Sequence, residues 1–367
     1  MATNLERPLI LGIETSCDDT ACAVVDGAGR VLASVVSSQV APHLPFGGVV
    51  PEIASREHLG NWPAVSQAAL EQAGVAMYDI DAVAATRGPG LVGSLLVGLS
   101  IGRAIGFALE RPFHGIHHLE GHLFSPFLSA HGQPAERLPD EFVGLVVSGG
   151  HTSLLEVTAK TVRSLVETRD DAMGEVFDKV GKRIGLLYPQ GPKVDELAEK
   201  GQASSVTFKV PPVGEDELFF SFSGLKSQAL REIELLEHRG KLSAERPLAG
   251  ALPGDGLNLL ASFRDAAVRQ IVDRLRRLHQ RRPIRTLAVS GGAAANRLLR
   301  RLLVRWAEEA SVNLRLVPLR FSGDNAAMIA YAALLRQLRG VAADPVETQA
   351  QSRIPFEASG AAAKISG

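Results

Sequence analysis

The chain has 367 residues, of which 46% are hydrophobic and 22% charged, and this balance is typical of a globular enzyme with room for two domains. Its net charge of −1 excludes a whole-molecule field that attracts polyanions. Two cysteines, Cys17 and Cys22, are too few for a disulfide framework and indicate buried thiols in a reducing cytosol. We expect no signal peptide. The most apolar window, 92–109, contains Arg103 and several small residues, so we expect a packed core helix and no membrane span.

A pattern of three consecutive strands occurs twice, at residues 9–36 and 142–166. In each copy the first turn is small and polar, and helical stretches follow both copies. This alternation predicts sheets with helices on their faces. The expected helices cover 52–73, 94–109, 172–186, 194–200, 224–237, 257–280, 295–309 and 325–338, and further strands cover 83–86, 286–289 and 314–318. We expect a surface loop at 238–256 and a loosely ordered tail after residue 340.

Two histidines four residues apart, His118 and His122, form a candidate metal site. On a helix these positions share a face, so both imidazoles can reach one ion, and imidazole suits zinc or iron. The alternative is a pair of ordinary polar helix residues. A zinc peptidase is excluded because Glu120 does not directly follow His118, as the H-E-x-x-H motif requires.

A carboxylate far away in the chain, Asp324, is a candidate third ligand. It stands just before an expected helix, where an N-cap role for Asp324 or Asn325 is the alternative explanation. Two imidazoles and one carboxylate leave coordination positions open for substrate oxygens.

Small polar turns are candidates for phosphate binding. The glycines of the turns Ser148-Gly-Gly150 and Ser290-Gly-Gly292 let backbone N–H groups approach a phosphate, and the second turn also begins a helix. An acidic turn at 14–19 is the third of this set. Ordinary tight turns are the alternative, and neither a Walker loop nor a Rossmann fingerprint is present. Asp178 and Asp195 are candidates for ribose hydroxyls, or else are solvated helix charges.

The segment 264–305 contains twelve arginines and only two acidic residues. A solvated basic helix face is the usual explanation of such a bias, and docking of a polyanion such as RNA is the other.

Taken together, these motifs resemble the TsaD family, the tRNA N6-adenosine threonylcarbamoyltransferases, from about residue 9 to residue 338. The matching motifs are Gly12-Ile-Glu-Thr-Ser-Cys-Asp-Asp19, Pro51-Glu-Ile-Ala-Ser-Arg56, Arg87-Gly-Pro-Gly90, the pair His118 and His122, Val147-Ser-Gly-Gly-His-Thr152, Gly174-Glu-Val-Phe-Asp-Lys179, Phe220-Ser-Phe-Ser-Gly-Leu-Lys226, Ser290-Gly-Gly292 with Asn296, and Asp324-Asn325. The chain departs from the family pattern at Gln190 and at Ser322-Gly323, where the family has Gly and usually Cys or Ser followed by Thr.

The resemblance implies a two-lobed actin-like ATPase (ASKHA) α/β fold with duplicated RNase H-like subdomains. We expect an N-terminal lobe of 1–115 plus 325–340, a C-terminal lobe of 116–324 with the metal and nucleotide cleft, and a tail of 341–367. The implied metal ligands are His118, His122 and Asp324, for one divalent ion per subunit, with iron(II) preferred over zinc. The implied substrate-binding residues are Val146, Val147, Ser148, Gly149, Gly150, Asp178, Gly191, Asp195 and Asn296.

The implied reaction is transfer of a threonylcarbamoyl group from threonylcarbamoyl-AMP to N6 of adenosine 37 in tRNAs that read ANN codons. No general base is evident, and Glu14 and Asp18 are the candidates. The resemblance also implies TsaB and TsaE as partner proteins and a cytoplasmic location. Two alternatives stay open: a small-molecule kinase of the same fold, which would use Asp18 and Asp19 with Mg²⁺, and a non-catalytic scaffold, in which the histidine pair would be dispensable.

Overall fold

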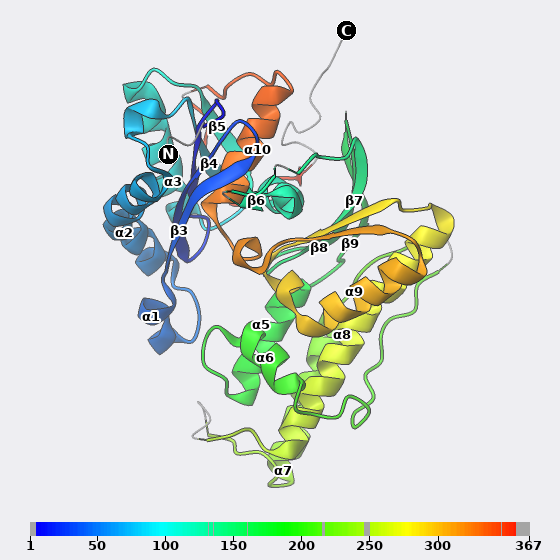
Figure 1. The fold of residues 1–367 in the computed structure, drawn as a ribbon. Helices are drawn as coiled ribbons and strands as arrows, with labels where there is room; N and C mark the ends of the chain where they lie inside the picture. Colours follow the sequence, from blue (N-terminus) through cyan, green and yellow to red (C-terminus); the bar gives the residue numbers. More distant parts are fainter. Residues whose placement is uncertain are drawn as a thin grey trace. The chain divides into compact units, whose positions relative to one another are not determined.

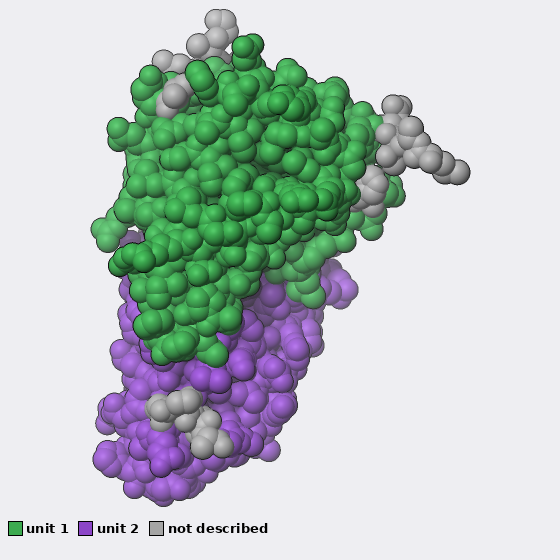
Figure 2. Space-filling model, turned by 90° about the vertical axis from the view of Figure 1, so that its left-hand side faces the viewer, with its two compact units in different colours: residues 1–140, 159–162, 317–367 green, residues 141–158, 163–316 purple. Residues whose placement is uncertain are grey.

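The computed structural model describes residues 5–356 except 131, 135, 160, 215–216, 246–249 and 346. The chain forms two compact units, coloured separately in Figure 2. The first comprises Met1–Asp140, Ala159–Val162 and Val317–Gly367, and the second comprises Glu141–Thr158 and Arg163–Leu316. None of the described helices has the length and apolar character needed to cross a membrane.

The first unit contains a six-stranded sheet in the order β5-β4-β1-β2-β3-β6 (Figure 1). Its strands are β1 Ile10–Glu14, β2 Asp19–Val25, β3 Arg30–Ser38, β4 Ala82–Gly88, β5 Phe113–His117 and β6 Ser129–Ala130. The chain runs antiparallel from β1 to β2 to β3, whereas β4 is parallel to β1 and β5 is parallel to β4. The carboxyl ends of β1, β4 and β5 therefore meet at one edge of the sheet.

Helices cover both faces of this sheet. Helices α2 (Pro51–Ala73) and α3 (Val92–Ala108) pack on one face, where Leu11 and Ile13 join them in a hydrophobic core (Figure 1). Helix α10 (Ala326–Leu338) packs on β1 and β2 from the other face. The glycine of β1 makes this approach possible, because a Cβ on Gly12 would lie 2.2 Å from the Ala326 carbonyl oxygen. The start of α10 is thereby held beside the end of β1.

Two short helices complete the described elements of this unit, α1 (Val40–His43) and α4 (His118–Phe124). Helix α4 continues directly from β5 and packs against α10.

The second unit contains a five-stranded sheet in the order β11-β10-β7-β8-β9. Its strands are β7 Glu141–Val147, β8 Thr152–Thr158, β9 Val162–Glu167, β10 Thr286–Ser290 and β11 Asn313–Leu316. β7 is antiparallel to β8 and parallel to β10, which is parallel to β11. Since this order repeats that of β5-β4-β1-β2-β3, the predicted fold class with its duplicated topology is confirmed.

Five helices accompany this sheet: α5 Met173–Ile184, α6 Gln190–Ala198, α7 Ser223–His238, α8 Gly254–Arg281 and α9 Arg297–Glu309. Their apolar faces and the sheet share one hydrophobic core, which includes Phe177, Phe263 and Trp306. Three of them begin before the expected positions. Helix α6 starts at Gln190 and not at 194, α7 starts at Ser223 and not at 224, and α8 starts within the predicted loop 238–256.

The observed division into two compact units differs from the expected lobe boundaries at 115 and 324. The segment after residue 115 stays with the first unit, because α4 packs on α10 and β6 pairs with β3. His118, His122 and Asp324 consequently all belong to the first unit and not to the second.

The expectation of a loose tail is wrong for its described part. Residues 341–345 and 347–356 lie against the first unit, where the backbone N–H of Asp344 donates to Phe113 (2.8 Å) and that of Gln351 to Arg87 (2.9 Å). The remainder of the expected tail, 357–367, lies outside the described residues.

Candidate metal centre and substrate loops

The histidine pair lies where β5 passes into α4. His117, the last residue of β5, caps this helix, because its Nδ1 accepts the N–H of Leu119 at 3.1 Å. The rings of His118 and His122 then fall on one side of the helix, with centroids 4.7 Å apart. His122 is fully buried and His118 is 8% exposed.

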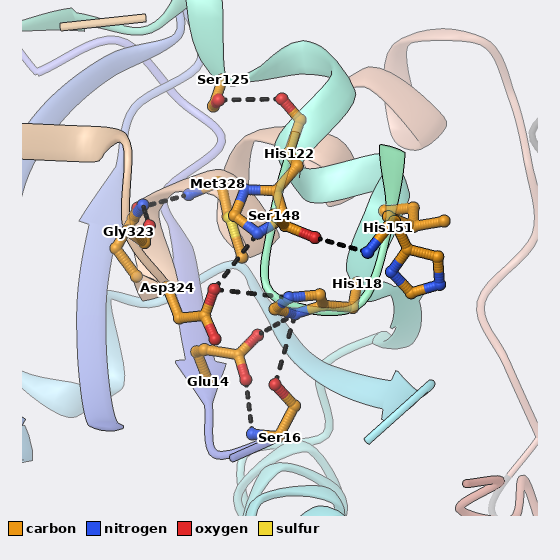
Figure 3. Close-up of polar contacts among 12 residues, drawn as sticks. Glu14, Ser16, His118, His122, Ser125, Ser148, His151, Gly323, Asp324 and Met328 are labelled. Atoms are coloured by element: carbon orange, nitrogen blue, oxygen red, sulfur yellow. Dashed lines mark hydrogen bonds and ion pairs between the residues drawn. The ribbon is translucent and has the colours of Figure 1, made fainter. Parts of the chain in front are cut away.

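The carboxylate of Asp324 meets both imidazoles (Figure 3). Its Oδ1 lies 3.4 Å from His118 Nε2 and 3.1 Å from His122 Nε2. One ligand atom from each of the three residues lies within 4.8 Å of the others. In a tetrahedral site with bonds of about 2.1 Å, neighbouring ligand atoms lie roughly 3.4 Å apart. The three side chains therefore fit a single divalent ion, and their chemistry suits zinc or iron(II).

A buried carboxylate, Glu14 at the end of β1, orients the first histidine (Figure 3). Its Oε2 lies 3.1 Å from His118 Nδ1 and accepts the hydroxyl of Thr86 at 2.6 Å. Its Oε1 accepts the backbone N–H of Ser16 at 2.5 Å, and the Ser16 hydroxyl lies 3.3 Å from the same His118 nitrogen. With Nδ1 held by Glu14, the Nε2 of His118 faces Asp324 and is the nitrogen that could bind an ion.

The charges of this cluster favour a cation. Burial alone would lower the pKa of His118, but Asp324 and Glu14 raise it well above its usual value. Burial alone would raise the pKa of Asp324, but His118 and His122 bring it well below its usual value. Burial lowers the pKa of His122, and the charge of His118 acts in the same direction. Two carboxylates thus face the imidazole pair, and a divalent ion that replaces the proton on His118 would neutralise their charge.

The acidic turn after β1 separates the two candidate bases. Glu14 is fully buried against His118, whereas Asp18 is partly exposed. Burial, together with the charge of Asp18, raises the pKa of the neighbouring Asp19 to about 7. Burial also raises the pKa of the Cys17 thiol, which argues against a reactive thiolate at this turn.

In the second unit, the predicted phosphate turns lie on adjacent strands. Val146 and Val147 are buried in β7, and Ser148–Gly150 form the turn to β8. Gly149 and Gly150 are exposed, and among the described residues a Cβ on either would meet no atom within 4 Å, so open space lies before them. Ser290 pairs with Val146 in the sheet, which brings the turn at 290–292 beside the turn at 148–150.

The residues predicted to bind the nucleoside lie in the second unit and are connected by hydrogen bonds. Asp178 of α5 accepts the backbone N–H of Gly191 at 2.7 Å. Asp195 of α6 accepts the N–H of Arg297 at 3.0 Å, and Asn296 caps α9 by accepting the N–H of Leu299 at 3.0 Å. The structure thus joins Asp178 to Gly191, and Asp195 to the residue that follows Asn296. Asp195 is buried, which does not match the alternative of a solvated helix charge for this residue.

The arginine-rich segment is largely paired with acids. Arg264 and Arg274 are buried, the first against Asp195 and Glu199 and the second against Asp273. Farther along, Arg282 and Arg301 pair with Glu141 and Glu199. Much of the predicted positive charge is therefore neutralised within the unit, and docking of RNA on this face stays a prediction.

Some residues that the sequence does not single out make hydrogen bonds to the residues around the metal centre. Ser16 and Thr86 contact Glu14, and Ile354 accepts a hydrogen bond from the cap residue His117. Ser16 lies within the predicted acidic turn 14–19 and Thr86 ends the predicted strand 83–86, but the sequence does not indicate that either residue contacts Glu14. Nothing in the sequence pattern points to Ile354.

Comparisons with known proteins show the family to which this chain is similar. The family model described as TsaD, tRNA N6-adenosine threonylcarbamoyltransferase, matches residues 30–331. A relative from Pelobacter propionicus with that name is 47% identical over 88% of this chain and 90% of its own length. Another with that name, from Thermus thermophilus, is 42% identical over 95% of this chain and 99% of its own length.

Solved structures show the fold alone. The crystal structure of T. kodakarensis HypF has a TM-score of 0.59 at 16% identity and covers 92% of this chain and 49% of that chain. The full-length HypF structure in its phosphate- and nucleotide-bound form has a TM-score of 0.55 at 14% identity, over 91% of this chain and 56% of that chain.

Proposed function

This chain belongs to the TsaD family, and on that premise we propose that it transfers the threonylcarbamoyl group from threonylcarbamoyl-AMP to N6 of adenosine 37 in tRNAs that read ANN codons. It is thus an acyltransferase that forms the modified base t6A. The observation that carries the proposal is the convergence of His118, His122 and Asp324 in a chain that matches its named relatives over nearly their whole length. Neither a small-molecule kinase nor a non-catalytic scaffold is favoured by these relatives.

The acyl group of the adenylate is already activated, so the protein mainly has to position the two substrates for acyl transfer. We propose that the backbone N–H groups at 148–150 face the phosphate or the acyl carbonyl, beside Val146 and Val147. Asp178, Gly191, Asp195 and Asn296 would then hold the nucleoside. A divalent ion on His118, His122 and Asp324, iron(II) in preference to zinc, would supply Lewis-acid stabilisation of charge on oxygen.

The attacking amine must give up a proton during acyl transfer. Between the two candidate bases, we propose Asp18, because Asp18 is partly exposed, whereas Glu14 is fully buried among His118, Thr86 and Ser16. Glu14 instead would hold the His118 ring in place.

The substrate and the family set the expected partners. The target adenine must leave its stack to be modified, which an anticodon loop permits at low cost. We propose that the chain acts in the cytoplasm, where it meets tRNA, and that it assembles with TsaB and TsaE.

The test is nucleoside analysis of tRNA by mass spectrometry, in cells depleted of this protein and complemented with variants. Wild type should restore t6A, whereas His118→Ala and His122→Ala should leave it near background. The control is His238→Ala, which removes an exposed histidine in the second unit and should restore t6A fully. Full t6A with both site variants would refute the metal-dependent transferase.

A further inference from the structure

We propose that the segment 347–356, here named the C-terminal strap, is a positioning element for the metal ligand His118. This inference rests on the proposed metal site and goes beyond it, because the strap lies outside the part of the chain matched by the family model. Two separate sets of contacts connect the strap to His118, one through His117 and the other through the loop 87–91.

The first route is the cap residue of α4. Because Nδ1 of His117 accepts the N–H of Leu119, the ring proton must be on Nε2, which then donates to the Ile354 carbonyl at 3.2 Å. The Phe356 ring packs edge-on against the same imidazole, with centroids 4.9 Å apart. His117 is fully buried and directly precedes His118. The strap thus fixes the ring that begins the helix of the metal ligands.

The second route starts in the middle of the strap. The N–H of Gln351 donates to the Arg87 carbonyl at 2.9 Å, and the N–H of Gly90 donates to the Ser352 carbonyl at 3.3 Å. The packing is close, because a Cβ on Gly88 would lie 2.1 Å from the Gln351 carbonyl oxygen. The strap is therefore seated on the backbone of the loop 87–91.

That loop in turn holds Ser16 on its other side. The N–H of Leu91 donates to the Ser16 carbonyl at 2.8 Å, and a Cβ on Gly90 would lie 2.6 Å from the same oxygen. The Ser16 hydroxyl lies 3.3 Å from His118 Nδ1 (Figure 3). Both routes consequently end at the same imidazole.

A helix as short as α4 depends on such support. Its seven residues cannot form a stable helix alone, so the cap and the tertiary contacts determine where His118 and His122 point. Metal affinity is sensitive to this, because loss of an outer contact of a metal ligand typically weakens binding roughly 10- to 100-fold. We therefore expect changes in the strap to weaken metal binding more than they weaken substrate binding.

The test uses full-length Ile354→Ala/Phe356→Ala, which removes the buried Ile354 side chain and the Phe356 ring and so loosens the strap, although the Ile354 carbonyl itself remains. Arg353→Ala is the matched control, because Arg353 is an exposed residue of the same strap. Zn²⁺ affinity is measured by competition with a chromophoric chelator, and ligand geometry by the visible spectrum of bound Co²⁺. The double variant should bind Zn²⁺ on the order of tenfold more weakly and shift the Co²⁺ spectrum. Arg353→Ala should match wild type in both measurements.

A second variant separates the cap from the strap. His117→Asn keeps a side-chain acceptor suited to an N-cap but removes the ring that donates to Ile354. It should weaken Zn²⁺ binding by a similar factor. In the combined variant, Zn²⁺ affinity should fall by less than the product of the two separate factors, because both changes remove the same contact, that between the His117 and Phe356 rings. If the double variant does not fold, the single Phe356→Ala takes its place, since this partly exposed ring contributes less to the core.

Two results would overturn the inference in distinguishable ways. If a folded strap variant has the Zn²⁺ affinity and the Co²⁺ spectrum of the wild type, the strap has no role in positioning His118. The proposed metal site would not be affected by that result. Absence of Zn²⁺, Fe²⁺ and Co²⁺ binding by wild type would refute the metal site itself, and the role of the strap with it.

Discussion

At the scale of single residues, the position of Glu14 decides its role. A carboxylate that is fully buried, accepts two protein hydrogen bonds and faces an imidazole nitrogen has little freedom to take a proton from a substrate. It resembles the outer carboxylates that orient metal-binding histidines and raise their basicity. Burial alone would raise the pKa of Glu14, but the charge of His118 brings it below the usual value, so the carboxylate stays ionised.

Replacement of this carboxylate tests the assignment. Glu14→Gln keeps the size of the side chain but removes its charge, so we expect Zn²⁺ affinity to fall roughly 10- to 100-fold in chelator competition. Asp18→Asn is the comparison variant, and it should keep Zn²⁺ affinity while slowing threonylcarbamoyl transfer in vitro. Wild-type Zn²⁺ affinity in Glu14→Gln, combined with lost transfer, would show that Glu14 acts on the substrate and not through His118.

The residues of the metal centre differ in how far the sequence predicts them. His118 and His122 follow from helical spacing, and Asp324 from its position at a helix start and from the family motifs. Ser16, Thr86 and Ile354 do not follow, because their contacts join residues that are far apart in the chain. The separations are 102 residues for Ser16 and His118, 72 for Thr86 and Glu14, and 237 for Ile354 and His117. Periodicity within one segment carries no information on such pairs.

At the scale of elements, one acidic residue ties three helices of the second unit together. Glu199 ends α6 and forms two hydrogen bonds with Arg301 of α9, at 2.9 and 3.0 Å, as well as an ion pair with Arg264 of α8. Arg301 and Arg264 lower the pKa of Glu199 to about 2, against the opposing effect of burial. The same three helices position Asp195 and Asn296, so this contact supports the proposed nucleoside site.

This link predicts a dependence of stability on pH. Because the folded pKa lies below the unfolded value of about 4.3, the ionised Glu199 stabilises the fold above that value, and the contribution is lost as the pH falls toward about 2. With allowance for partial exposure, Glu199→Gln should cost about 1 to 2 kcal/mol at pH 7. When urea unfolding is measured at pH 7 and at pH 3, the difference in free energy of unfolding between wild type and Glu199→Gln should be smaller at pH 3.

The control for this measurement is on the same helix. Glu196→Gln alters an exposed acid that lies 4.0 Å from Lys200, and it should change the free energy of unfolding little at either pH. An equal gap between wild type and Glu199→Gln at both pH values would contradict the assigned charge coupling.

Element boundaries show where local patterns stop being informative. Helix α6 begins at Gln190, before the expected position, because Pro192 is tolerated within the first turn of a helix although Gly191-Pro192 reads as a loop. Strand β6, with two residues, is too short to show any period. The described tail is ordered by backbone hydrogen bonds to β4 and β5, and its aperiodic sequence gives no sign of them.

At the scale of the whole molecule, the sequence predicts the duplication but not the division of the chain. The repeated strand pattern is a local property, and both sheets adopt the same order. The division depends on which sheet receives the segment after residue 115, and that is settled by pairing of β6 with β3 and packing of α4 on α10. As a result the predicted metal ligands lie in the first unit, whereas the predicted adenylate residues lie in the second.

This separation predicts that a metal ion stabilises one unit selectively. Each unit has its own hydrophobic core and one of the two tryptophans, Trp62 in the first and Trp306 in the second. Trp306→Phe and Trp62→Phe therefore leave a single fluorescent reporter for the first and second unit, respectively. Zn²⁺ at about 100 times its Kd should raise the free energy of unfolding reported by Trp62 by about 2.7 kcal/mol. The transition reported by Trp306 should rise much less, and His118→Ala should abolish the effect on Trp62. Equal stabilisation at both reporters would contradict a metal site confined to the first unit.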